Sequence, residues 1–321
     1  MCAERSSLPQ ACLGVSTSRK RLRRPSLTEG EPALSFAPEK PATYHPPLKI
    51  ADDTYLIQQT QKAAIGPLWV YLNSLVIKGS EPVIVDTGTP VNREQWLKDV
   101  FSIVDPGDVR WIFLSHDDVD HAGNLHQVME ACPNATLVVT WFLTERHASE
   151  FNFPHDRCRW VNDGDSFRAG DRTLTAITPP LFDSPVTRGL YDDRTGVYWA
   201  VDSFATPLPG PMDHIGELEK AAWQQGVTMF NCWNSPWFRM LDPDKFERHV
   251  DRVQNLELEA VAACHSPVIR RSEIDEAFGM IRALPRMDAP PQPTQGDLDD
   301  LMHAIATGKE YVWEPPLPVG S

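Results

Sequence analysis

The chain has 321 residues, of which 41% are hydrophobic, and it carries 44 acidic against 30 basic side chains for a net charge of −14. Such an excess of negative charge excludes nonspecific nucleic-acid binding, because the phosphate backbone requires a basic surface. No stretch approaches the roughly 20 apolar residues that a membrane-spanning helix needs. The composition therefore predicts a protein with a large buried core that binds neither nucleic acid nor a bilayer.

The cysteines are scattered along the chain, at positions 2, 12, 132, 158, 232 and 264, without a C-x-x-C pair. This pattern is typical of free, reduced thiols and not of a disulfide framework or a cysteine zinc site. The chain also lacks the opening pattern of a signal peptide, so we expect a cytoplasmic protein. Cys264 precedes His265 on a predicted strand, and its thiol is expected to point into the core, opposite to its neighbour.

The two ends of the chain differ in composition from the middle. Residues 1–50 contain eight basic and four acidic side chains and seven prolines, with almost no apolar periodicity. We expect a disordered basic extension over residues 1–47. Residues 286–321 are again rich in proline, with one helical stretch near 297–306, and are expected to form a C-terminal tail. The folded domain is predicted to cover residues 48–285.

Short apolar runs predict the elements of the middle of the chain. Runs rich in β-branched and aromatic residues predict strands at residues 54–57, 70–77, 82–86, 111–114, 136–139, 172–177, 196–201 and 258–264. Apolar residues at helical spacing predict helices at residues 92–104, 121–132 and 242–256. Strands and helices do not alternate strictly, since hairpin-like pairs also occur. This mixture predicts an α+β fold in which two mixed β-sheets pack face to face, with helices on their outer faces.

The most informative stretch follows the predicted strand at 111–114 and reads Ser-His-Asp-Asp-Val-Asp-His-Ala-Gly-Asn over residues 115–124. Five imidazole or carboxylate side chains fall within residues 116–121. Such side chains need partners when they follow an apolar strand, and a cation serves several of them at once. The spacing of His116, Asp118, Asp120 and His121 suits a loop that directs two ligands to one ion and two to a second ion. A solvated acidic turn is the alternative.

This pattern resembles the metallo-β-lactamase superfamily over about residues 50–285. An Asp-Thr-Gly turn at residues 86–88 follows one strand, the H-x-D-x-D-H-x-G-N motif follows a later strand, and an isolated Asp and a late His come afterwards. The resemblance implies a four-layer αββα sandwich in which Asp86 supports the ligand loop without binding metal. It also implies that Asp202 bridges two ions and that His265 is the last ligand.

Within the superfamily the chain is most similar to the di-iron domain of the flavodiiron proteins, which carry Glu where this chain has Asp118. Those proteins have a further His ligand upstream of the bridging Asp, and Asp183 occupies its register here. A plain loop carboxylate is the alternative role for Asp183. By resemblance, the ligands of one ion are His116, Asp118 and Asp183. By the same resemblance, the ligands of the other ion are Asp120, His121 and His265, and Asp202 lies between the two ions.

Three His and four Asp make an oxygen-rich ligand set for two divalent ions, which favours iron or manganese, although imidazole also admits zinc. Two such ions support either of two reactions. We expect first a hydrolase in which Asp120 and Asp202 are catalytic and a metal-bound hydroxide attacks the substrate. The reason is that flavodiiron proteins carry a flavodoxin domain after the metal domain, and residues 285–321 are too short for one. The alternative is a di-iron oxidoreductase that reduces O₂ or NO with electrons from a separate flavin or iron–sulfur partner.

Aromatic residues near the expected ligands suggest the kind of substrate. An aromatic wall favours planar or apolar ligands, so a hydrolase would act on a small aromatic or apolar molecule with an activated ester, ether or amide bond. The rings considered for this wall are Trp199, Trp233, Trp237 and Phe238. Core packing is their alternative role. By resemblance to flavodiiron proteins, we also expect an oligomer of identical chains or one formed with a related chain.

Overall fold

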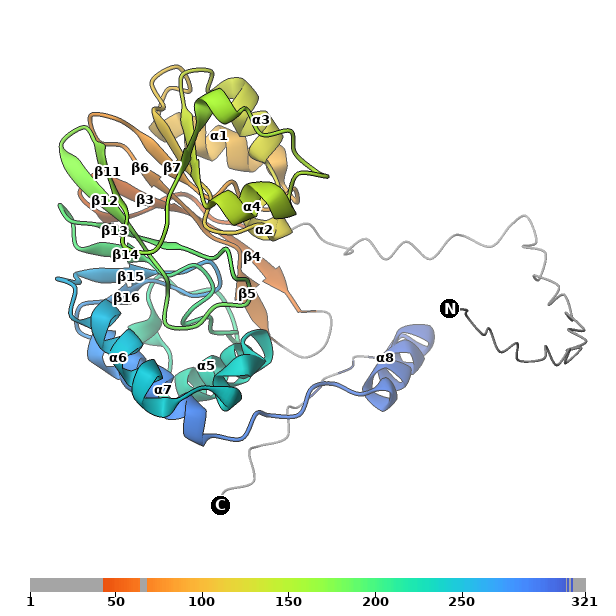
Figure 1. Ribbon diagram of the computed structural model, residues 1–321. Coiled ribbons are helices and arrows are strands. Elements are labelled where there is room, and N and C mark those ends of the chain that lie inside the picture. Colours follow the sequence, from red (N-terminus) through yellow and green to blue (C-terminus); the bar gives the residue numbers. More distant parts are fainter. Residues whose placement is uncertain (1–42, 64–67, 310, 312, 314–321) are drawn as a thin grey trace, which may run out of the picture. The chain divides into compact units, whose positions relative to one another are not determined.

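The computed structural model of the protein describes residues 43–63, 68–309, 311 and 313 (Figure 1). Most of the predicted disordered extension lies outside the described residues, and so does the end of the predicted C-terminal tail. The described part of the extension includes a short strand, β1 (Thr43–Tyr44). Among the described residues, no helix has both the length and the apolar character needed to cross a membrane.

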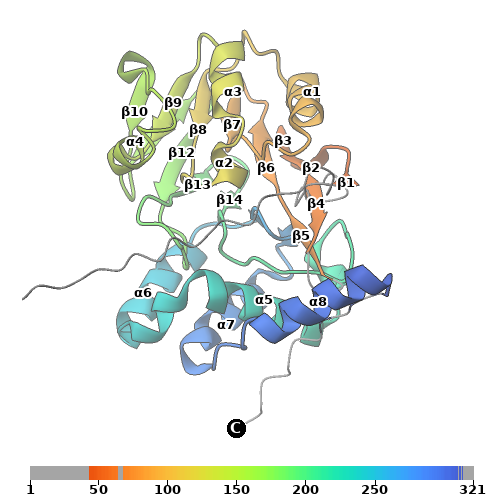
Figure 2. The ribbon, with the colours of Figure 1, turned by 90° about the vertical axis from the view of Figure 1, so that its right-hand side faces the viewer.

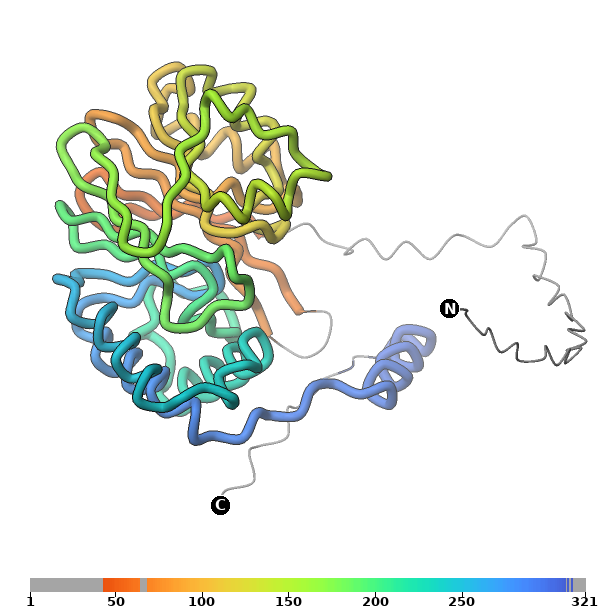
Figure 3. Tube along the Cα trace, in the orientation of Figure 1, coloured from red at the N-terminus to blue at the C-terminus, as the bar shows by residue number. Residues whose placement is uncertain are grey.

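Two large mixed β-sheets form the centre of the fold, as the sequence predicted (Figure 1). Within the described residues the first sheet has seven strands, in the order β10 (Cys158–Trp160), β9 (Thr136–Val139), β8 (Trp111–Phe113), β7 (Val83–Val85), β6 (Ser74–Ile77), β3 (Thr54–Ile57) and β2 (Leu48–Ala51). The second has six described strands, in the order β11 (Ser166–Ala169), β12 (Arg172–Ile177), β13 (Gly189–Asp192), β14 (Val197–Trp199), β15 (Ala260–Ala262) and β16 (Ile269–Arg270). The trace in Figure 3 shows that each sheet comes from one continuous half of the described chain.

The alternation of side chains along each strand decides which layer a residue joins. Val83 and Val85 are buried with residues of the opposite sheet, whereas Ile84 packs with the helices on the outer face. On the second sheet, Trp199 lies between the sheets and Tyr198 packs on the outer face. Both sheets are therefore apolar on both faces, and each requires a layer of helices.

Helices cover these outer faces, so the fold is the predicted four-layer αββα sandwich (Figures 1 and 2). The first sheet packs against α1 (Arg93–Ile103), α3 (Leu125–Ala131) and α4 (Trp141–Arg146). The second packs against α5 (Lys220–Asn234), α6 (Pro243–Gln254) and α7 (Ile274–Ala283). The remaining described helices are α2 (Val119–Ala122), α8 (Gln295–Thr307) and the short 3₁₀ helices η1 (His155–Arg157), η2 (Ile215–Glu217), η3 (Pro236–Met240) and η4 (Leu284–Arg286).

The single strand predicted at residues 70–77 is wrong, because the run divides between two sheets. Its first part belongs to β5 (Trp69–Tyr71), which pairs with β4 (Gln59–Lys62) in a third sheet that also contains β1. Its second part is β6 of the seven-stranded sheet. The break falls at Asn73, whose backbone N–H donates to the Cys264 carbonyl at 2.9 Å. The chain leaves the third sheet there because the turn after β15 accepts the hydrogen bond of the Asn73 backbone N–H.

The single helix predicted at residues 121–132 is also wrong, because α2 and α3 are separated at Gly123 and Asn124. The Asn124 amide donates to the carbonyls of Thr87 and Thr89 at 2.7 and 3.0 Å, which fastens this corner to the turn after β7. A Cβ atom at Gly123 would lie 2.4 Å from the Val119 carbonyl oxygen, so only glycine allows this close approach. The break between α2 and α3 therefore helps to position the motif.

Replacement of Trp96 tests how much the packing of α1 on the first sheet contributes to stability. Its ring is fully buried between α1 and the sheet, and its indole N–H donates to the Ser74 hydroxyl at 2.8 Å. We expect Trp96→Ala to lower the free energy of unfolding by about 3–5 kcal/mol, because it leaves a cavity and an unpaired hydroxyl. Trp160, which is 52% exposed, is the control, and Trp160→Ala should change stability by less than about 1 kcal/mol. Urea denaturation of both variants gives the comparison, and equal losses would contradict this core.

Candidate metal centre

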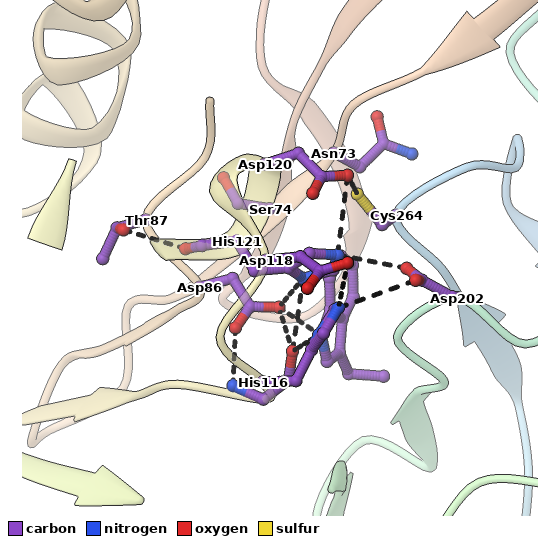
Figure 4. A network of polar contacts seen from close by, with 12 residues as sticks. Asn73, Ser74, Asp86, Thr87, His116, Asp118, Asp120, His121, Asp202 and Cys264 are labelled. Carbon is purple, nitrogen blue, oxygen red and sulfur yellow. Dashed lines mark hydrogen bonds and ion pairs between the residues drawn. The ribbon is translucent and has the colours of Figure 1, made fainter. Parts of the chain in front are cut away.

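The motif and the later Asp and His come together at one edge of the sandwich. Asp86 follows β7 and His116 follows β8, which is the parallel neighbour of β7. Asp202 and His265 follow β14 and β15, which form the parallel pair of the second sheet. Because parallel neighbours end at the same edge, the four loops converge there. Figure 4 shows Asp86, His116 and Asp202 in one network of polar contacts.

A buried carboxylate, Asp202, lies at the centre of this network. Its Oδ1 atom lies 3.0 Å from Nε2 of His121 and 3.3 Å from Nε2 of His265. Its Oδ2 atom lies 3.7 Å from Nε2 of His116. All three imidazoles are buried and direct their Nε2 atoms at the same carboxylate. This is the arrangement expected of a carboxylate that two ions share.

The first group of ligand-type atoms lies on the Oδ1 side of Asp202. This group consists of Asp120, His121, Cys264 and His265. One ligand atom of each residue lies within 4.8 Å of the corresponding atoms of the other three. Nε2 of His265 is 3.2 Å from Oδ2 of Asp120. The three residues predicted from the sequence to hold one ion are therefore close together. Their binding of a metal stays a prediction.

The second group lies on the other side and is more open to solvent. It consists of His116, Asp118 and Asp183, again with one ligand atom each within 4.8 Å of the others. Nε2 of His116 is 3.7 Å from Oδ2 of Asp118. Partial desolvation and the neighbouring Asp202 carboxylate raise the pKa of Asp183. A cation in this group would relieve that repulsion, which supports the predicted role of Asp183 as a ligand.

Asp117 lies within the motif but joins neither group. Its Oδ2 atom accepts a hydrogen bond from Nε of Arg146, on α4, at 2.8 Å. Its Oδ1 atom accepts from the Ser184 hydroxyl at 3.3 Å. Asp117 therefore joins the metal-binding loop to α4 and to the loop that carries Asp183. The predicted ligand set already omitted this residue, but the sequence did not indicate its contacts with Arg146 and Ser184.

Asp86 supports the motif through hydrogen bonds, as the resemblance implied, and belongs to neither ligand group. It is fully buried, and its Oδ2 accepts hydrogen bonds from Nδ1 of His121 at 2.8 Å, the Ser115 hydroxyl at 2.7 Å and the Trp199 indole at 2.9 Å. A carboxylate on Nδ1 fixes the imidazole tautomer that presents Nε2 to a metal. Nδ1 of His265 lies 2.8 Å from the Tyr71 carbonyl, which does the same for that ring.

Asn73 is a positioning residue that the sequence analysis missed. Its side-chain amide donates to the carbonyls of Ala263 and Ser266 at 3.0 and 2.9 Å, in addition to the backbone bond to Cys264. These bonds hold the segment that carries His265. The sequence signal is a polar residue inside an apolar run, and the prediction of one continuous strand over residues 70–77 hides it.

The charge balance of the buried groups fits a bound cation. Burial alone would raise the pKa of Asp202, but the imidazolium charges of His265, His121 and His116 outweigh burial and hold that pKa well below its ordinary value. Nε2 of His116 is buried and has no hydrogen-bond partner among the described residues. An unpaired buried nitrogen is costly, and a metal ion would satisfy it. These residues therefore fit a metal centre.

The predicted aromatic wall stays a prediction, and two of its four rings pack in the core. Trp199 and Phe238 are fully buried in the core on the two faces of the second sheet, so their alternative role of core packing applies. Trp237 is half-buried and packs on Phe182, with ring centroids 4.8 Å apart. Phe230 was not considered, yet its ring centroid lies 5.1 Å from that of His265. Among these rings, the printed ring contacts place Phe230, on α5, beside a predicted ligand.

Comparison with known proteins identifies the family of the chain. A family model described as "ODP family beta lactamase" matches residues 71–266. The chain belongs to this ODP family. The matched residues are more than half of the chain and include every predicted ligand.

Several proteins are similar to this ODP-family chain. It is 27% identical over 215 residues to the nitric oxide reductase of Moorella thermoacetica, an alignment that covers 64% of this chain and 52% of that protein. It is 25% identical over 208 residues to an uncharacterised protein of Methanocaldococcus jannaschii, covering 64% and 50%. The chain thus spans about half the length of the curated relatives it matches.

Solved structures share the fold of the ODP-family chain. The rubredoxin oxygen:oxidoreductase from Desulfovibrio gigas has a TM-score of 0.66 at 16% identity, with 76% of this chain and 62% of that chain covered. The flavodiiron protein from Giardia intestinalis has a TM-score of 0.66 at 18% identity, with 84% and 69% covered. These matches confirm the predicted metallo-β-lactamase fold.

Substitution of single ligands tests the two groups. We expect Asp120→Ala and His265→Ala each to lose the ion of the first group and Asp183→Ala to lose that of the second, because each removes a charge or donor from a small ligand set. Elemental analysis of the purified variants gives the metal-to-protein ratio. Asp288→Ala, at a side chain that is 96% exposed, should retain the wild-type ratio. A wild-type ratio in Asp183→Ala would show that Asp183 is a plain loop carboxylate.

Asp86 is expected to behave differently from the ligands. Asp86→Ala leaves the His121 imidazole, the Ser115 hydroxyl and the Trp199 indole without their common acceptor. We expect a loss of about 3–5 kcal/mol in the free energy of unfolding, together with metal binding that is weakened about 10- to 100-fold. Thermal unfolding and metal titration measure the two effects. A variant of wild-type stability that has lost one ion completely would instead make Asp86 a ligand.

Proposed function

We propose that this protein is a binuclear metal-dependent oxidoreductase that reduces a diatomic gas, O₂ or NO. The observation that carries the proposal is the ligand set itself, three imidazoles and three carboxylates around a shared fourth carboxylate, Asp202, in a chain of this family. Oxygen-rich sets of this kind suit iron or manganese better than zinc. A pair of iron ions held there would supply the redox chemistry that carboxylates and imidazoles lack.

The names of the relatives favour this reaction over hydrolysis, which the sequence analysis placed first. One relative is named nitric oxide reductase, and others are named anaerobic nitric oxide reductase flavorubredoxin. The preference for hydrolysis rests on the expectation that a flavodoxin domain does not fit in these residues. A separate electron donor removes that objection, since reduction needs electrons and does not require that the donor belong to the same chain.

The protein's own residues have three tasks in such a reaction. Asp86 and the Tyr71 carbonyl hold the rings of His121 and His265 in a fixed orientation, so that little reorganisation is needed when ions bind. Asp202 keeps the two groups at a fixed separation. Phe230 covers one side of His265 with an apolar ring, which favours a small apolar gas over water at that side.

The electron donor is proposed to be a separate flavin or iron–sulfur protein. Among the described residues, groups of three or more ligand-type side chains occur only at this centre, and Cys132, Cys158, Cys232 and Cys264 form no disulfide. The described residues therefore offer no second cluster of metal ligands and no disulfide that could carry electrons. The oligomer and the cytoplasmic location expected from the sequence stay predictions.

Gas consumption under controlled metal loading tests the proposal. The full chain is loaded with iron under anaerobic conditions, and O₂ and NO electrodes record consumption after addition of a reduced flavin. We expect iron-dependent consumption, slowed more than about 100-fold in His265→Ala because loss of a ligand exceeds the usual cost of changing an outer-shell partner. Asp288→Ala is the control and should retain the wild-type rate. Cleavage of aromatic esters by the zinc or manganese form, without gas consumption by the iron form, would establish the hydrolase instead.

A further inference from the structure

Cys264 is a ligand-type residue that the predicted ligand set omits. Its side chain is fully buried, and its Sγ atom lies 3.8 Å from Oδ2 of Asp120. In the part of the chain that the structure describes, it is the one member of the clustered ligand-type groups without a predicted role. We propose that Cys264 is a sulfur ligand of the ion held by Asp120, His121 and His265. This inference rests on the proposed metal centre.

The separations between the donor atoms match one coordination sphere. Donor atoms at about 2.0–2.3 Å from one four- or five-coordinate ion lie about 3–4 Å from one another, which leaves a position for Asp202 as well. From Oδ2 of Asp120, Nε2 of His265 is at 3.2 Å, Nε2 of His121 is at 3.7 Å and Sγ of Cys264 is at 3.8 Å. The four side chains therefore need only small movements to enclose one ion.

Strand alternation does not apply at Cys264, which corrects the prediction that its thiol points away from His265. The thiol is buried between the sheets as expected, but β15 ends at Ala262, so Cys264 and His265 lie in the turn that follows. The backbone N–H of Cys264 donates to the Val201 carbonyl at 2.7 Å, and its carbonyl accepts from Asn73. Figure 4 shows the Cys264 sulfur directed at the Asp120 carboxylate. The backbone thus fixes the sulfur at the centre.

A second observation points to a cation rather than to a simple thiol–carboxylate hydrogen bond. Nε2 of His116 is fully buried and aimed at the neighbouring His121 and Asp202, yet it has no hydrogen-bond partner among the described residues. It lies 3.7 Å from the nearest oxygens of Asp118 and Asp202, too far for a hydrogen bond. The Oδ2 side of Asp202 therefore presents a buried ring nitrogen that has no partner among the described residues.

A sulfur ligand would make the two ions chemically different. The ion beside Cys264 gains a soft ligand, which favours iron or zinc over manganese, whereas the ion beside Asp118 and Asp183 keeps hard oxygen ligands. Replacement of Cys264 is therefore expected to change which metal the first group prefers while leaving the second group unchanged.

Cobalt absorption spectra test the proposal on the full chain. The metal-free protein is titrated with Co²⁺, whose bond to a thiolate gives a near-ultraviolet charge-transfer band. Wild type should show this band. Cys264→Ser should still bind cobalt, with visible bands, but should lack the near-ultraviolet band and bind at least about tenfold more weakly at the first group. Cys232→Ser replaces another buried thiol, on α5, and should retain the wild-type spectrum.

Each other result has a definite meaning. Cobalt binding by wild type without the near-ultraviolet band would overturn the sulfur ligand and leave Cys264 as a hydrogen-bond donor to Asp120, with the metal centre intact. Failure of wild type to bind cobalt would overturn the centre itself.

Discussion

A buried carboxylate surrounded by three imidazoles is the constraint on which the rest of this structure depends. Asp202 is held away from water, and its charge is stable there only because positive charge or a metal lies beside it. The three rings that face it come from the motif and from the turn after β15. The loops that carry these residues must therefore meet at this edge of the two sheets.

The residues that surround the centre support it in ways that a list of ligands does not show. Asp86 orients His121 and is itself held by the Trp199 indole from the opposite sheet. Asn73 performs the corresponding task for the segment that carries His265. Asn73 of the first sheet thus holds the ligand segment of the second, and Trp199 of the second sheet holds the Asp86 carboxylate of the first. This arrangement couples the stability of the sandwich to the geometry of the centre.

The layers of the fold were predictable from the sequence, because strand alternation and helical spacing depend on local patterns of apolar residues. The convergence of seven distant side chains was predicted through the motif and the family resemblance. The strand break at Asn73 and the helix break at Gly123 were not predicted, since both depend on contacts with segments far away in the chain. The Cys264 thiol is buried in the core as predicted, but its closeness to His265 was not predicted, because β15 ends at Ala262 and distant contacts with Val201 and Asn73 hold the turn that follows.

The account as a whole depends on two ions sharing Asp202. The most direct measurement is anomalous X-ray diffraction from crystals of the iron-loaded protein. The account predicts two anomalous peaks about 3.5–4 Å apart, one on each side of the Asp202 carboxylate. A single peak bound to one oxygen, or peaks elsewhere on the molecule, would contradict it.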